Sequence, residues 1–154
     1  MGEQQAPVFA IEKLYLKDLS LEIPGAPQVF LERDTPQLDI SMHDEARALE
    51  HEGLYEVVLT VTVTAKIKER TMFLVEAAQA GIFQIRNLPQ EELGPVLGIL
   101  CPNTLLPYAR EVVSTTVMRA GFPPVVLNHM SFETVYQQRM EQMAQQQQAA
   151  AAAP

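Results

Sequence analysis

The chain has 154 residues, 47% of them hydrophobic, which fits one domain with a core of its own. Its formal net charge of −8 disfavours nucleic-acid phosphates and anionic lipids as partners, and favours cationic ones. The sequence contains no apolar run long enough to insert into a membrane and no secretory signal pattern, and its single cysteine, Cys101, excludes an internal disulfide and suits a reducing cytoplasm.

The N-terminal part predicts a disordered lead followed by a strand with two different faces. Residues 1–7 are polar and end in a proline, so we expect them to be disordered. The first strand is predicted from about Phe9 to Ile23. From residue 18 onward polar and apolar residues alternate, which puts Asp18 and Glu22 on one face and leucines on the other. One face is therefore acidic, and the other needs a core.

Three further strands are predicted before any long helix. Residues 37–43 alternate apolar and polar side chains, and the charged residues 44–53 predict a loop or one helical turn. Residues 54–67 are rich in β-branched side chains, which favour a half-buried strand. The short charged turn at 68–70 predicts an antiparallel hairpin with a fourth strand at 71–85. Because four strands precede any long helix, this order indicates the α+β class rather than alternating βαβ units.

The C-terminal half predicts helices separated by proline-rich breaks. Residues 87–107 contain four prolines and two glycines, which predict a short helix and then a crossing loop. A long helix is predicted at about 104–120, and a last helix begins after Ser131 and keeps apolar residues at helical spacing to Met143. Residues 144–154 form a low-complexity Gln/Ala tail, which we expect to fray.

The fourth strand carries the most informative anomaly. Glu76 marks its outer face but is surrounded by apolar residues, so neither face is properly polar. A small domain with one sheet and few helices cannot cover both sides of such a strand, and an exposed apolar sheet surface indicates a partner. A loop of the same chain lying over the strand would explain the pattern equally well.

Signals for catalysis are weak. The three histidines are scattered, and no second cysteine is present to complete a zinc site. Cys101 precedes a proline at a predicted helix start, where a thiolate could be stabilised, but no partner base is visible. The sequence favours a buried structural thiol and leaves a thiol enzyme as the alternative. It contains neither a glycine-rich phosphate loop nor a serine nucleophile motif.

Four segments resemble SecB, the family of protein-export chaperones. They are YLKDLSLEIPGAPQVF, LYEVVLTVTVTAK, FLVEAAQAGIFQI and LCPNTLLPYAREVVSTTVMRAGFPPVVL. The resemblance covers about residues 8–140, and its most specific part is the CPN-x-LxPYARE segment beside a GxFPPxxL turn. We therefore expect a single SecB-like domain at 8–143.

The resemblance implies a fold, an assembly and a function. The expected fold is a four-stranded antiparallel sheet backed by two main C-terminal helices, assembling as a dimer of dimers. The expected function is that of a cytoplasmic, ATP-independent chaperone that holds unfolded precursor proteins in a translocation-competent state and delivers them to SecA, the translocation ATPase. No cofactor, metal or catalysis is implied. The open alternatives are a holdase dedicated to a single client, such as an antitoxin, and the Cys101 thiol enzyme.

The resemblance also implies three groups of site residues. The positions matching the SecA contact are Asp18, Glu22, Leu74 and Glu76. The positions tied to oligomer packing are Val75, Ala77 and Gln79. Candidates for lining a precursor groove are Phe30, Leu38, Ile40, Met42, Phe73 and Tyr108. Thr35 stands where the family often has a tryptophan, which puts one aromatic groove contact in doubt.

Overall fold

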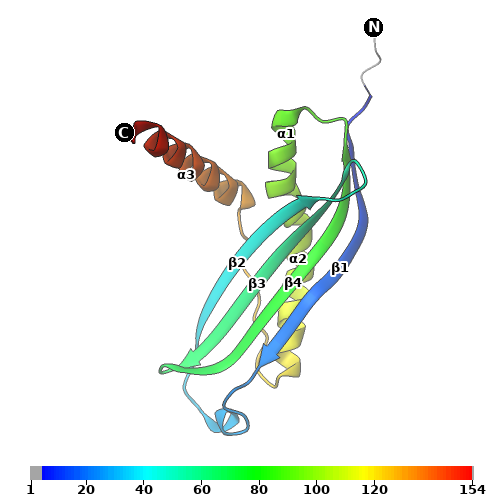
Figure 1. Ribbon diagram of the computed structural model, residues 1–154. Coiled ribbons are helices and arrows are strands. Elements are labelled where there is room, and N and C mark those ends of the chain that lie inside the picture. The colour runs from blue at the N-terminus through cyan, green and yellow to red at the C-terminus, as the bar shows by residue number, and fades with distance from the viewer. Residues whose placement is uncertain (1–4, 154) are drawn as a thin grey trace.

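The computed structural model describes residues 5–153 and shows an antiparallel sheet with helices packed against one face (Figure 1). Strand order across the sheet is β1–β4–β3–β2. The elements are β1 Val8–Glu22, β2 Gln37–Ala48, β3 Leu54–Ile67, β4 Arg70–Arg86, α1 Gln90–Pro95, α2 Cys101–Arg119 and α3 Phe132–Ala152. The predicted α+β class and four-stranded antiparallel sheet are confirmed. Most of the expected N-terminal lead, residues 1–4, lies outside the described part.

β1 contains two irregularities that the alternation from residue 18 onward did not predict. Its pairing with β4 shifts between Ile11 and Lys13 and again between Leu16 and Asp18, as expected for two β-bulges. After each extra residue, the side chains that face the helices change from odd-numbered to even-numbered positions of the strand, or back again. The side chains brought to the helix side are Phe9, Ile11, Leu14, Leu16, Leu19 and Leu21, because their partners on β4 face the core.

β2 is longer than predicted. A loop or one helical turn was expected from residue 44, but the strand continues to Ala48 and pairs with β3 throughout. Asp44 forms an ion pair of 2.9 Å with Arg139 of α3, and Arg47 lies opposite Glu56 and pairs with it. These partners on β3 and α3 stabilise an extended conformation for residues whose own strand propensity is low, so the loop prediction was wrong.

The β3–β4 hairpin forms as predicted, and its helix-facing side makes the core. β3 has the predicted bounds, and the turn is tight, with Lys68 at a φ of 53°. α2 lies across β3 and β4 and buries their apolar side chains (Figure 1). The main contributors are Val57, Leu59, Val61 and Phe83 from the sheet, with Leu105, Ala109 and Val113 from α2.

The prolines after β4 do not produce the predicted crossing loop. A π-helical turn, Val96–Leu100, joins α1 directly to α2, so that Cys101 begins the helix. Because Pro95 and Pro102 lack a backbone N–H, a wider turn can bypass the missing hydrogen bonds without the chain leaving the helical path. The crossing connection is instead residues 123–131, which run back beside α2, where the Arg110 Nε donates to the Leu127 carbonyl at 2.8 Å.

α3 begins where predicted and ends later. The Ser131 hydroxyl accepts from the backbone N–H of Thr134, which caps the helix. The Tyr136 ring lies against Gly98, where an added Cβ would come within 2.6 Å of the ring. The helix continues through the Gln/Ala stretch to Ala152, contrary to the expected fraying, although residues 140–153 are all exposed. Within residues 5–153, no helix has the length and apolarity needed to cross a membrane.

Candidate functional site

The outer face of the sheet, which points away from α2, gathers the four predicted SecA-contact residues. Glu22 lies directly opposite Leu74, and Ser20 lies opposite Glu76. Residues opposite one another in an antiparallel pair point to the same side. Asp18 is two residues from Ser20 on the same face, opposite Ala78. We call Asp18, Glu22, Leu74 and Glu76 the acidic face.

The carboxylates of the acidic face are open to a partner. Asp18, Glu22 and Glu76 are all exposed, and Leu74 between them is half-buried. The Thr62 hydroxyl donates to Glu76 at 3.3 Å. Within residues 5–153 none of the three carboxylates forms an ion pair. Anionic groups left uncompensated on a sheet surface can receive lysine or arginine side chains of another protein.

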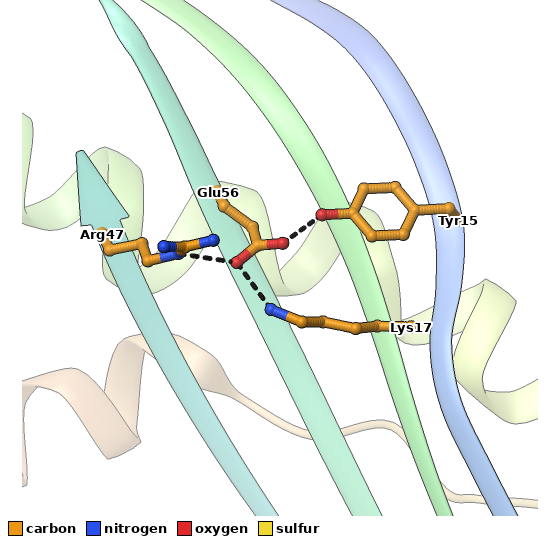
Figure 2. Close-up of polar contacts among 4 residues, drawn as sticks. All are labelled: Tyr15, Lys17, Arg47 and Glu56. Atoms are coloured by element: carbon orange, nitrogen blue, oxygen red, sulfur yellow. Dashed lines mark hydrogen bonds and ion pairs between the residues drawn. The ribbon is translucent and has the colours of Figure 1, made fainter. Parts of the chain in front are cut away.

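A second polar group on the outer face was not predicted (Figure 2). The Glu56 carboxylate accepts hydrogen bonds from the Tyr15 hydroxyl, from Lys17 Nζ at 2.9 Å and from Arg47 Nε at 2.9 Å. These four residues, the Glu56 cluster, come from β1, β3 and β2, and the Glu56 side chain is only 7% exposed. Sequence reasoning missed the cluster because 41 residues separate Tyr15 from Glu56; the one available signal was a carboxylate amid the threonines of β3.

The environment of the cluster shifts the pKa of two of its members. Burial disfavours the charged form of Glu56, but the hydrogen bonds from Tyr15, Lys17 and Arg47 outweigh it and lower the pKa of Glu56 from 4.5 to about 2. Burial, the hydrogen bond to Glu56 and the negative charge of that carboxylate raise the pKa of Tyr15 from 10.0 to about 12. The cluster therefore holds one ionised acid and one neutral phenol over a wide pH range.

These shifts predict that the cluster stabilises the fold only within a pH window. The contribution of Glu56 is fully present above the unfolded pKa of 4.5 and is lost as the pH falls toward 2, because the unfolded chain binds the proton first. The contribution of Tyr15 is fully present below pH 10 and is lost as the pH rises toward 12, because the unfolded chain releases the proton first. Urea unfolding across this range measures both limbs.

Two variants separate the loss of stability at acid pH from the loss at alkaline pH. Glu56→Gln should flatten the decline in unfolding free energy on the acid side, and Tyr15→Phe should flatten it on the alkaline side. Glu12→Gln, on the same edge strand, is the matched control for the acid limb. An acid limb of the same depth in Glu56→Gln and in the unsubstituted protein would contradict the assignment.

The helix side of the sheet carries an apolar groove at the start of β2. It has a volume of about 460 Å³. Its walls include Phe30, Thr35, Leu38, Phe73, Phe122 and Pro123. The Phe122 ring stacks between two others, with centroids 5.1 Å from Phe30 and 4.8 Å from Phe73. The structure thus brings together three of the predicted groove residues and adds Phe122, which the sequence signalled only through the FPP turn.

The remaining predicted groove residues lie elsewhere. Ile40 and Met42 continue along the same face of β2, opposite Val63 and Val61. Tyr108 is exposed on α2 and is not among the residues that line the groove. Thr35 does line it, so the absence of an aromatic side chain at this position leaves that wall smaller and more polar.

The three residues predicted for oligomer packing are buried within the chain. Val75, Ala77 and Gln79 lie on the helix side of β4, and none is open to solvent. Their side chains cannot touch another protein directly while the fold is intact. Any effect on assembly would pass through α2, which packs over β4.

Cys101 is enclosed at the start of α2. Its side chain has no exposed surface, and burial raises the pKa of the Cys101 thiol to about 12. At neutral pH the thiol is therefore protonated and out of reach of a substrate, which opposes a nucleophilic role.

Comparisons with known proteins identify the family of the chain. The family model described as preprotein translocase subunit SecB matches residues 2–143. The protein-export protein SecB of Nitrosospira multiformis is 61% identical over 140 residues, covering 91% of this chain and 87% of that protein. The one from Thiobacillus denitrificans is 57% identical over 152 residues, covering 99% and 98%.

A solved structure shares the fold at much lower sequence identity. It is a SecB-like chaperone of Mycobacterium tuberculosis in complex with a peptide from an antitoxin, with a TM-score of 0.65 and 19% identity. The likeness covers 80% of this chain and 91% of that one. The family model spans residues 2–143, and the two relatives are 61% and 57% identical to this chain. The chain therefore belongs to the SecB family.

Proposed function

We propose that this chain is a cytoplasmic export chaperone that holds unfolded precursor proteins in a translocation-competent state and delivers them to SecA. The observation that carries the proposal is the separation of two surfaces on one sheet. An apolar groove opens on the helix side, and uncompensated carboxylates lie on the outer side. A chain with this arrangement can hold a client on one side while a cationic partner docks on the other.

The groove suits binding of many unfolded sequences. Its aromatic and aliphatic walls offer apolar area, whose burial contributes roughly 25 cal/mol per Å² without regard to the order of side chains in the client. Ile40 is exposed further along β2 and extends the apolar track beyond the groove. Holding a client in this way consumes no nucleotide, and we propose that the protein acts by binding rather than by catalysis.

We also propose that the chain assembles as a homotetramer, a dimer of dimers. Leu19 and Leu21 of β1 face Val112 of α2 across a hollow of about 370 Å³. Both leucines remain exposed in the single chain, as do Tyr108 and Met118 on the outer side of α2. Exposed apolar side chains on neighbouring elements favour burial between subunits. Several grooves in one particle would bind a long client at several points and raise its effective affinity.

The acidic face supports the proposed delivery step. Its carboxylates are exposed and lack ion-pair partners within the described chain, so a basic segment of SecA would not have to displace an existing salt bridge. Attraction between opposite charges would speed the encounter and make it sensitive to salt. The face belongs to the sheet rather than to a loop, which presents the charges in a fixed pattern.

Suppression of aggregation tests the proposed function. Light scattering from a chemically unfolded precursor protein, diluted into buffer, should stay low when this protein is present, and ATP should make no difference. Leu38→Glu in the groove should abolish the effect, and Leu31→Glu, at an exposed leucine outside the groove, should not. A monomer by light scattering that leaves aggregation unchanged would overturn the proposal. Co-purification of many precursors, rather than one protein, separates general export from a dedicated client.

A further inference from the structure

We infer that the Glu56 cluster is a positioning device: it fixes the β-bulge at Lys17 and thereby decides that Asp18 and Glu22 point outward. The structural half of this inference stands alone, and its consequence for SecA rests on the proposed function. Glu56 itself is too well covered to be a docking residue.

The register of β1 shows what the bulge does. Leu16 lies opposite Gln79 and Asp18 lies opposite Ala78, so that Lys17 is an extra residue between neighbouring rungs. If Lys17 took a regular place in the ladder, every later residue of the strand would turn over. Asp18 and Glu22 would then face α2, and the leucines between them would face outward.

Within a single chain, before assembly, the apolar pattern of β1 specifies this register only weakly. Leu16, Leu19 and Leu21 are on the helix side yet remain 42%, 42% and 38% exposed. Register is strongly fixed where one face of a strand is fully buried and is prone to slip where it is not. β1 is also an edge strand with a single partner, β4, in the sheet of this chain. A chain that has not yet assembled therefore needs a second constraint, and it must act at the bulge.

The Glu56 cluster supplies that constraint from the correct place. Lys17 is the bulge residue, and its Nζ lies 2.9 Å from Glu56 Oε1 on β3, beyond the intervening strand β4 (Figure 2). The Tyr15 hydroxyl reaches the same carboxylate, so both contacts cross β4 just before Asp18. β4 presents Ala78 and Ala80 on this face, and these small side chains leave room for the crossing.

The cluster also keeps two cations of the outer face away from the carboxylates of the acidic face. Glu56 holds two cations, Lys17 and Arg47, on a single carboxylate oxygen. Lys17 is next to Asp18 in the chain, so without Glu56 it would be free to neutralise the acidic face. Fixing the bulge and binding Lys17 have the same result, because both leave the Asp18 carboxylate exposed and, within the described chain, unpaired on the outer face.

A cross-strand disulfide reports the register without any partner protein. Ser20 and Glu76 lie directly opposite each other, so a Ser20→Cys, Glu76→Cys protein should oxidise readily, and the buried Cys101 should not compete. Adding Glu56→Gln or Tyr15→Phe should slow this oxidation by up to about tenfold, because one lost charge-assisted hydrogen bond changes the ratio of the two registers by about that factor. Lys17→Met should act likewise, and Lys13→Met, at a lysine that forms no ion pair within residues 5–153, should not.

Deletion of Lys17 provides the decisive rescue. Without this residue Leu16 and Asp18 become neighbours in an uninterrupted alternation, so the strand no longer needs the cluster. In proteins without the added cysteines, Glu56→Gln should weaken SecA binding about tenfold, and deletion of Lys17 in that background should restore it. Unchanged disulfide formation in Glu56→Gln overturns the inference. An unsubstituted protein that fails to bind SecA overturns the delivery proposal instead, and leaves the register result to decide the inference.

Discussion

Glu76→Lys should weaken the binding of SecA by about a hundredfold while folding and client binding stay unchanged, because a reversed charge replaces attraction by repulsion at the partner's basic surface. Glu76 lies between Ser20 of β1 and Thr62 of β3 and is exposed, so the lysine fits without disturbing the core. Titration calorimetry with purified SecA at low and high salt measures the loss. The difference between the two proteins should shrink as salt screens the charges.

A matched charge reversal away from the sheet separates local docking from net charge. Glu91 is exposed on the short helix α1, so Glu91→Lys changes the formal charge equally without touching the outer face. SecA should bind this variant nearly as tightly as the unsubstituted protein. An equal loss in both variants, or unchanged affinity in Glu76→Lys, would refute the assignment of the acidic face.

Phe73→Ala should lower the free energy of unfolding by about 3–5 kcal/mol, the range for truncating a buried phenylalanine. The Phe73 side chain is only 2% exposed and packs against Phe122, so its removal leaves a cavity between β4 and the turn after α2. Urea unfolding at neutral pH, followed by circular dichroism, measures the change. Client binding should also weaken, since Phe73 forms part of the groove wall.

Phe30 provides the comparison that divides stability from binding. It stacks on the same Phe122 ring but is 47% exposed, so Phe30→Ala should cost about 1 kcal/mol or less. Client affinity should still fall, because the ring lines the groove. Similar destabilisation by the two substitutions, or undiminished client binding in Phe30→Ala, would contradict this division of roles.

The strands that could be predicted were those whose pattern is complete within the strand itself. β3 alternates apolar and polar residues from Leu59 to Ile67, and a short turn leads into β4, so both their bounds and their pairing followed from local chemistry. The last third of β2 could not be found this way, because it is held by Glu56 on the neighbouring strand and by Arg139, which lies 95 residues beyond Asp44 in the chain. The helical path through Pro95 and Pro102 was missed because prolines normally mark its end.

In the candidate site, too, the residues that could be predicted are those with a local sequence pattern. The outward direction of Asp18 and Glu22 followed from alternation within six residues, and the structure brings them beside Glu76. The Glu56 cluster depends on the alignment of three strands and left no local trace except its own carboxylate. Assignment of these surfaces to SecA and to clients came from the family resemblance and stays a proposal.

The C-terminal helix has a consequence for experiments on the protein in solution. α3 touches the body through its first turns, by Phe132, by Tyr136 against Gly98 and by Arg139 with Asp44. The twelve residues after Met140 extend away from the rest of the chain over roughly 18 Å at the helical rise of 1.5 Å per residue (Figure 1). The protein thus carries its own spacer arm, to which a fluorophore or a surface-capture tag can be attached at a distance from both the groove and the acidic face.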